Sequence, residues 1–122
     1  MKPPEVRKYL FDIAEACSLI ERFTAGKTFD DYVGDPLLRS GVERQFEIVG
    51  EALSRMLQLA PDLTPRITDA GRIVAFRNRL IHGYASVADE VVWGVVERNL
   101  ATLERETQEL LNEPLPGPRP DR

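Results

Sequence analysis

The longest periodic stretch of the sequence is PLLRSGVERQFEIVGEALSRMLQLA, residues 36–60. Its apolar side chains recur at steps of three and four, at Leu38, Val42, Phe46, Val49, Leu53 and Met56. Such steps place residues on one face of an α-helix. The stretch therefore predicts a long amphipathic helix whose apolar face must be covered by other parts of the chain.

Three further stretches show the same period, and they predict helices over residues 4–23, 68–82 and 89–111. The polar segment 28–35 predicts a loop or a single turn, and prolines 61 and 65 bracket a short break. Four amphipathic helices joined by short links are typical of a bundle. We therefore predict an all-α fold, an antiparallel four-helix bundle, with no strand and no internal repeat.

The chain is one domain in length, and we place that domain at residues 4–112. The proline-rich tail, residues 113–122, is predicted to be disordered. No apolar run is long enough to cross a bilayer, and the first residues do not resemble a signal peptide, so we expect a cytoplasmic protein with no membrane contact.

Composition also narrows the chemistry. The net charge of −4 argues against a generally basic nucleic-acid-binding domain, so any such contact must be local. The single cysteine, Cys17, lies on the apolar stripe of the first helix and is expected to be an inert core residue. One histidine and one cysteine exclude a zinc site built from the His and Cys ligands of one chain, and we expect no cofactor.

The chemistry-bearing segment is RNRLIHGY, residues 77–84, at the end of the third predicted helix. Residues 66–82 carry four arginines and one aspartate, a net charge of +3, which leaves about −7 for the rest of the chain. A local positive field on an acidic protein suits a phosphate site. Alternatively, these arginines pair with acids on neighbouring helices.

Helix geometry limits what this segment can do. Asn78 and Arg79 lie four and three residues before His82 and neighbour it on the helix surface. Arg77 lies five residues before His82, about 140° around the axis. Arg77 and His82 can therefore flank one small ligand only if the helix end unwinds at Gly83, or if two chains meet.

A homodimer would resolve this difficulty. Cleavage of RNA through its own 2′-hydroxyl needs a base and an acid, and histidine suits both roles near neutral pH. The chain has one histidine. A symmetric dimer would bring two copies of His82 and two of Arg77 to one cleft. Apolar residues outside the main stripes also favour a dimer, namely Ile48, Leu57, Ile81 and Val91.

The arrangement of Arg77, four residues, His82, one residue and Tyr84 resembles the signature of the HEPN superfamily, and more specifically of its HepT-like toxins. The segments YLFDI (9–13), IVGEA (48–52) and VVW (91–93) resemble the first, second and fourth helices of that family. The resemblance covers roughly residues 5–112. The sequence departs from it at DAGR (69–72), where many relatives carry a tryptophan.

The resemblance implies an all-α HEPN-type homodimer that is a metal-independent endoribonuclease, the toxin of a type VII toxin–antitoxin system acting on tRNA or mRNA. It makes Arg77 and His82 catalytic, with Asn78 and Arg79 in supporting roles. The partner it implies is an MntA-like nucleotidyltransferase antitoxin. That partner would use ATP to place AMP on Tyr84, and would thereby silence the toxin.

Other interpretations remain open. The chain could be a non-catalytic helical adaptor or nucleotide-binding partner of a nucleotidyltransferase, or a purely structural dimer. In the adaptor the same residues would bind nucleotide or partner carboxylates. As purely structural residues, His82 would be a helix C-cap at the negative end of the macrodipole and Tyr84 a core residue.

A row of carboxylates on the second predicted helix also has two interpretations. Glu43, Glu47 and Glu51 are spaced four apart, but no Glu-x-x-His motif accompanies them, so a di-iron site is not expected. We expect a solvated face on which Glu51 pairs with Arg55. Alternatively, one of these carboxylates holds an arginine of the basic segment.

Overall fold

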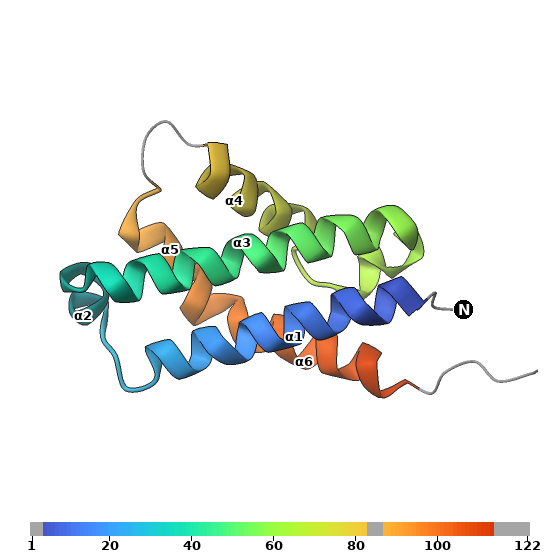
Figure 1. The fold of residues 1–122 in the computed structure, drawn as a ribbon, viewed down its shortest axis with the longest axis horizontal. Coiled ribbons are helices and arrows are strands. Elements are labelled where there is room, and N and C mark those ends of the chain that lie inside the picture. The colour runs from blue at the N-terminus through green and yellow to red at the C-terminus, as the bar shows by residue number, and fades with distance from the viewer. Residues whose placement is uncertain (1–3, 83–86, 114–122) are drawn as a thin grey trace, which may run out of the picture.

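The computed structural model describes residues 4–82 and 87–113. These residues form α1 (Pro4–Thr24), α2 (Phe29–Gly34), α3 (Pro36–Leu59), the 3₁₀-helix η1 (Pro61–Arg66), α4 (Ala70–His82), α5 (Asp89–Arg98) and α6 (Leu100–Asn112). The long helices run alternately in opposite directions (Figure 1), and the described part of the chain contains no strand. The predicted all-α antiparallel bundle is confirmed.

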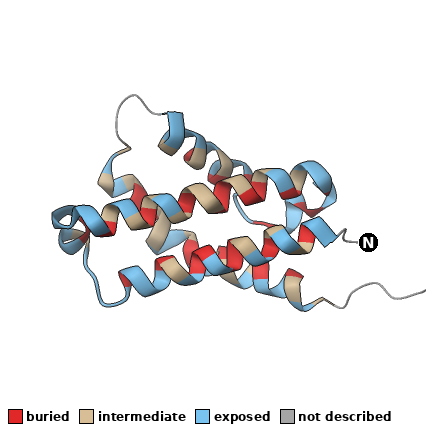
Figure 2. Ribbon diagram, viewed as in Figure 1, coloured by how far each residue is buried: buried red, intermediate tan, exposed pale blue. Residues whose placement is uncertain are grey.

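The core lies between α3 and the helices around it. α3 packs against α1 on one side and α4 on the other, and α6 covers α1. All six stripe residues predicted for α3 are buried, and the buried positions of α1 and α3 form inward-facing stripes (Figure 2). Cys17 is fully buried in this core, and burial raises its pKa to about 12.

The helix starts are encoded by short capping sequences. The carboxylate of Asp35 accepts hydrogen bonds from the backbone N–H groups of Leu37 (3.0 Å) and Leu38 (3.1 Å), which satisfies free donors of the first turn of α3. The segment predicted as a loop or single turn is the short helix α2. Thr28 and Asp31 form a reciprocal capping box there, and that box stabilises helical geometry in an otherwise polar segment.

The helix predicted over residues 89–111 is in fact two helices, and this prediction was wrong. The helix is distorted at Asn99, which keeps a right-handed backbone but with φ −114°, and whose side-chain amide donates to the Asp69 carboxylate at 3.3 Å. The third predicted helix also starts two residues late, at Ala70. Thr68 cannot continue the helix because the next residue, Asp69, has a left-handed backbone with φ 58°. The N–H (2.9 Å) and the hydroxyl (2.7 Å) of Thr68 donate to Glu106 on α6. These side-chain bonds attach the beginning of α4 to α6.

Several predictions concern residues outside the described ranges. Gly83, Tyr84 and all of the predicted tail except Glu113 lie there. Within the described ranges, no helix is both long enough and apolar enough to cross a membrane. The apolar residues flanking the main stripes are only partly covered, and Ile81 is 43% exposed.

Candidate functional site

The site begins at the crossing of α3 and α4, where a glycine faces an arginine. Gly50 lies in the middle of α3, directly against Arg77 of α4. A Cβ atom at position 50 would overlap Cβ and Cγ of Arg77. Gly50 therefore permits a backbone approach that any other residue would prevent. The signal in the sequence was an isolated glycine inside a helical pattern, which usually has a packing reason, and sequence analysis did not use it.

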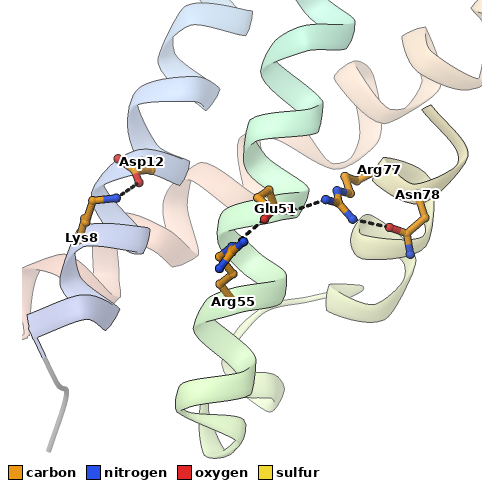
Figure 3. A network of polar contacts seen from close by, with 6 residues as sticks. All are labelled: Lys8, Asp12, Glu51, Arg55, Arg77 and Asn78. Carbon is orange, nitrogen blue, oxygen red and sulfur yellow. Dashed lines mark hydrogen bonds and ion pairs between the residues drawn. The ribbon is translucent and has the colours of Figure 1, made fainter. Parts of the chain in front are cut away.

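The guanidinium of Arg77 is held from two sides. Its Nη2 donates to the carboxylate of Glu51 on α3, and its Nη1 donates to Asn78 Oδ1 at 2.7 Å (Figure 3). Glu51 also accepts from Nε of Arg55 at 2.6 Å. Hydrogen bonding from Arg55 first, and then the charge of Arg77, lowers the pKa of Glu51 and keeps it ionised. Both open interpretations of Glu51 are thus correct, because it pairs with Arg55 and also holds an arginine of the basic segment.

Arg77 opens into a shallow groove of about 300 Å³ between α1, α3 and α4. We call it the Arg77 groove, and its walls include Tyr9, Ile48, Glu51, Arg77 and Ile81. The Arg77 side chain is 22% exposed, so the guanidinium is largely desolvated yet reachable. The groove therefore combines a fixed cation with apolar side chains that solvent can still reach.

His82 is separate from this groove. It is the last residue of α4 and is exposed, and within the described ranges no hydrogen bond or ion pair involves its side chain. Arg79 is also exposed and lines a different groove, on the α5 side of α4. One chain therefore brings Arg77, Asn78 and Glu51 together, but it does not bring His82 to the Arg77 groove.

A metal centre is not evident in the same region. Across residues 4–82 and 87–113, no group of three or more His, Cys, Asp or Glu side chains could hold a metal ion. The chemistry available at the end of α4 is that of a guanidinium, an amide and an imidazole. Such groups bind and protonate phosphate esters.

The sequence matches the family model described as "Ribonuclease HepT-like" over residues 13–110. The chain belongs to the HepT-like ribonuclease family. This result confirms the HEPN resemblance and the predicted enzyme class. Helices α3 and α4, which carry Glu51, Arg77 and Asn78, fall within the matched range, whereas Tyr9 of α1 precedes it.

Relatives of similar length support the assignment of this HepT-like chain. A protein of Thermococcus cleftensis named "Probable ribonuclease HepT" is 35% identical over 104 residues, which are 85% of this chain and 94% of the relative. A candidate RNase of Caldanaerobacter subterraneus is 30% identical over 91% of this chain and 96% of its own length. A candidate RNase of Methanocaldococcus jannaschii is 28% identical over 93% of each chain. No solved structure matches.

Proposed function

We propose that this chain is the endoribonuclease toxin of a type VII toxin–antitoxin system and that it acts as a homodimer without a metal ion. Membership of a ribonuclease family supports the activity. The observation that supports the site is Arg77, which Gly50 admits to the α3–α4 crossing and which Glu51 and Asn78 orient. Its proposed substrate is tRNA or mRNA, which places the activity in the cytoplasm.

Arg77 is suited to stabilise charge on a phosphate. A guanidinium has five N–H donors in a rigid plane, and the described contacts of Arg77 use two of them. Orientation by Glu51 and Asn78 removes the cost of ordering the side chain when substrate binds. Nε of Arg77 is buried without a hydrogen-bond partner in the described part of the chain, so the second N–H groups of Nη1 and Nη2 are the donors proposed to reach the oxygens of the phosphorus centre as negative charge develops there.

His82 supplies the proton transfers. One imidazole takes the proton of the 2′-hydroxyl as the 2′-oxygen bonds to phosphorus. The bond from phosphorus to the 5′-oxygen breaks, and an imidazolium gives its proton to that leaving oxygen. The products are a 2′,3′-cyclic phosphate and a 5′-hydroxyl, and no metal ion takes part. Because the chain has one histidine, we assign the base and the acid to His82 and to His82 of the partner subunit.

The Arg77 groove is the face that we assign to the dimer. Ile48 and Ile81 line it and are only partly covered in the single chain, and Tyr9 adds a half-buried aromatic ring. A second copy would cover these apolar groups. It would also bring the partner subunit's His82 toward Arg77, which α4 separates from its own His82 by about 140°.

The activity and its site are tested together. Wild-type protein, His82→Ala and Arg77→Ala are expressed from a repressible promoter and also incubated with tRNA and mRNA in the presence of EDTA. We expect arrested growth and RNA cleavage with wild type only. Arg105→Ala is the control, because Arg105 is 65% exposed on α6 and pairs only with Glu109 in the described part of the chain. If none of the four proteins slows growth or cleaves RNA, the activity is refuted and the non-catalytic adaptor is favoured.

The shared site has its own test. Wild-type and His82→Ala subunits are unfolded, mixed in varying ratios and refolded together. If each active site needs two imidazoles, activity falls with the square of the wild-type fraction. A linear fall would show that one His82 is sufficient.

We further propose that an MntA-like nucleotidyltransferase silences this toxin by AMPylation of Tyr84. The tyrosine hydroxyl oxygen would bond to the α-phosphorus of ATP, and pyrophosphate would leave. Tyr84 follows His82 by two residues, so a nucleotide there would place a negative charge and a bulky group beside the imidazole. Incubation with the partner and ATP should add AMP to wild type but not to Tyr84→Phe, as measured by intact mass. Modification of Tyr84→Phe would refute the assignment.

A further inference from the structure

A second groove lies on the opposite side of α4 from Arg77, between α4 and α5. Its volume is about 530 Å³. We call it the α4–α5 groove and define it by its three arginines, Arg72, Arg79 and Arg98, and by an apolar floor that includes Phe76 and Val95. The ribonuclease site described above does not include this groove.

The three arginines come from both helices that border the groove. Arg72 and Arg79 are seven residues apart on α4, which is two helical turns, so they share a face and lie about 10 Å apart along the axis. Arg98 comes from the last turn of α5, on the other side of the groove. Its guanidinium lies against Gly94, at the rim that the groove shares with the next hollow, so the positive charge along the groove comes mainly from Arg72 and Arg79.

Among the residues that the structure describes, these arginines have no acidic partner. In the described residues no ion pair involves Arg72, Arg79 or Arg98, whereas Arg55 and Arg77 are each paired with a carboxylate. The one acid in the groove, Asp69, accepts a hydrogen bond from Asn99. Cations without a described acidic partner, two on one face of α4 and one at the groove rim, repel one another in this chain of net charge −4, and a bound polyanion would relieve that repulsion.

The neighbouring hollow beyond α5 does not share this property. Arg98 borders it together with Lys27, but Glu90 and Glu97 line it as well. Two positive and two negative groups leave that hollow without net charge. Charge complementarity therefore favours the α4–α5 groove as the place for an extended anion.

We propose that the α4–α5 groove binds the sugar–phosphate backbone of the RNA substrate next to the scissile bond. This inference rests on the proposed ribonuclease function. Arg79 lies three residues before His82 and neighbours it on the surface of α4, so a strand held by Arg72 and Arg79 runs toward the imidazole. The groove is lined by Ile73, Phe76, Val91 and Val95, and Phe76 is buried, so none of the described lining residues offers an exposed ring for base stacking. Binding in the groove is therefore directed at phosphates and is nearly independent of sequence.

The test is the salt dependence of RNA binding. Fluorescently labelled single-stranded RNA is titrated with His82→Ala protein, which removes the proposed proton-transfer group, over a range of salt concentrations. Each lost phosphate contact should reduce the slope of log K against log salt by about 0.7. We therefore expect Arg72→Gln and Arg98→Gln each to weaken binding about fivefold at 0.1 M salt, and the double variant about 25-fold.

A matched control removes one charge elsewhere. Arg22 is an exposed arginine in the last turn of α1, and no ion pair involves it within the described ranges. Arg22→Gln should leave the slope unchanged. Circular dichroism and urea unfolding of all variants establish that they are folded, which is expected because each substituted side chain is exposed.

The outcomes separate this inference from the ribonuclease function. If wild type cleaves RNA but Arg72→Gln and Arg98→Gln keep the parental slope, the groove is not the binding track and the ribonuclease proposal stands. If wild type does not cleave RNA, the ribonuclease proposal fails, while the binding slopes still decide whether the groove holds RNA. A reduced slope for Arg22→Gln equal to that of the groove variants would overturn the inference, because the effect would then be one of net charge.

Discussion

The contact between Gly50 and Arg77 offers the sharpest test of how the fold positions the site. Gly50→Ala adds one methyl group at the α3–α4 crossing and changes no charge. That methyl carbon would lie 2.5 Å from Cγ of Arg77 and closer still to its Cβ. Ordinary carbon–carbon contacts are about 3.5–4.0 Å, so the two helices must separate by roughly 1 Å or more. Because the obstructing atoms are at the base of the side chain, a rotamer change cannot remove the clash.

The magnitude follows from two opposing effects. Overpacking at a helix crossing costs about 1–3 kcal/mol, and replacing a helical glycine with alanine returns about 1 kcal/mol. We expect a net loss of about 1 kcal/mol in the free energy of unfolding. Displacement of Arg77 by roughly 1 Å should reduce the rate of RNA cleavage by up to about 100-fold.

Gly94→Ala is the matched control. The three heavy atoms nearest to a Cβ atom at position 94 all belong to the guanidinium of Arg98, the far end of a flexible side chain. Arg98 can move aside, so the substitution should raise helix stability by about 0.5–1 kcal/mol. Urea unfolding followed by circular dichroism measures both variants, and cleavage of a labelled RNA under native conditions gives the rates.

The reasoning is refuted if Gly50→Ala unfolds at the same urea concentration as Gly94→Ala and cleaves RNA at the wild-type rate. It is also refuted if both glycine substitutions lower stability equally, since the effect would then not depend on Arg77.

Three further predictions concern single groups. Glu51→Gln should lower RNA cleavage roughly tenfold, because a charged hydrogen bond that orients the guanidinium is lost, whereas Arg55→Gln should not lower cleavage; equal rates in steady-state assays of the two variants would contradict this. Burial raises the pKa of Cys17 to about 12, so a thiol reagent at neutral pH should label it only after unfolding in urea, and rapid labelling of native protein would contradict the buried position. Hydrogen bonds from Thr28 in the capping box of α2 lower the pKa of Asp31 below its ordinary value of 3.8. The ionised Asp31 carboxylate therefore stabilises the fold above pH 3.8, and this stabilisation is lost as the pH falls below that value. The stability difference between wild type and Asp31→Asn should shrink in that acid range, and a difference that grows there would show the opposite linkage.

Much of the fold could be predicted because periodicity and local chemistry are written along the chain. The six apolar residues of the α3 stripe are all buried, and Asp35 and Pro36 mark the start of that helix. Prediction failed where a side chain from a distant segment intervenes. Asn99 bonds to Asp69 where α5 gives way to α6, and before α4 Thr68 bonds to Glu106 while Asp69 takes a left-handed backbone conformation. Neither contact leaves a trace in local periodicity.

The candidate site, like the fold, has features that the sequence predicts and features that only the structure shows. Its charged and titratable residues, their spacing on α4 and the resemblance to HepT-like toxins are all readable in the one-dimensional sequence. The roles of Gly50 and Glu51 were not resolved, because both depend on which residue of α4 crosses α3 at that point. The α4–α5 groove was missed because Arg98 lies 19 residues after Arg79 in the chain.

The sequence by itself determined the helices, the clustering of positive charge before His82 and the family, because hydrophobic period, residue type and motif spacing are local properties. Only the tertiary structure decided which face of α4 each arginine serves. Packing of α3 against one side of α4 buries Arg77 beside Glu51, and α5 on the other side leaves Arg72, Arg79 and Arg98 around an open groove. Which helix packs against which is set by burial across the whole core, and this is a property that no short stretch of sequence contains.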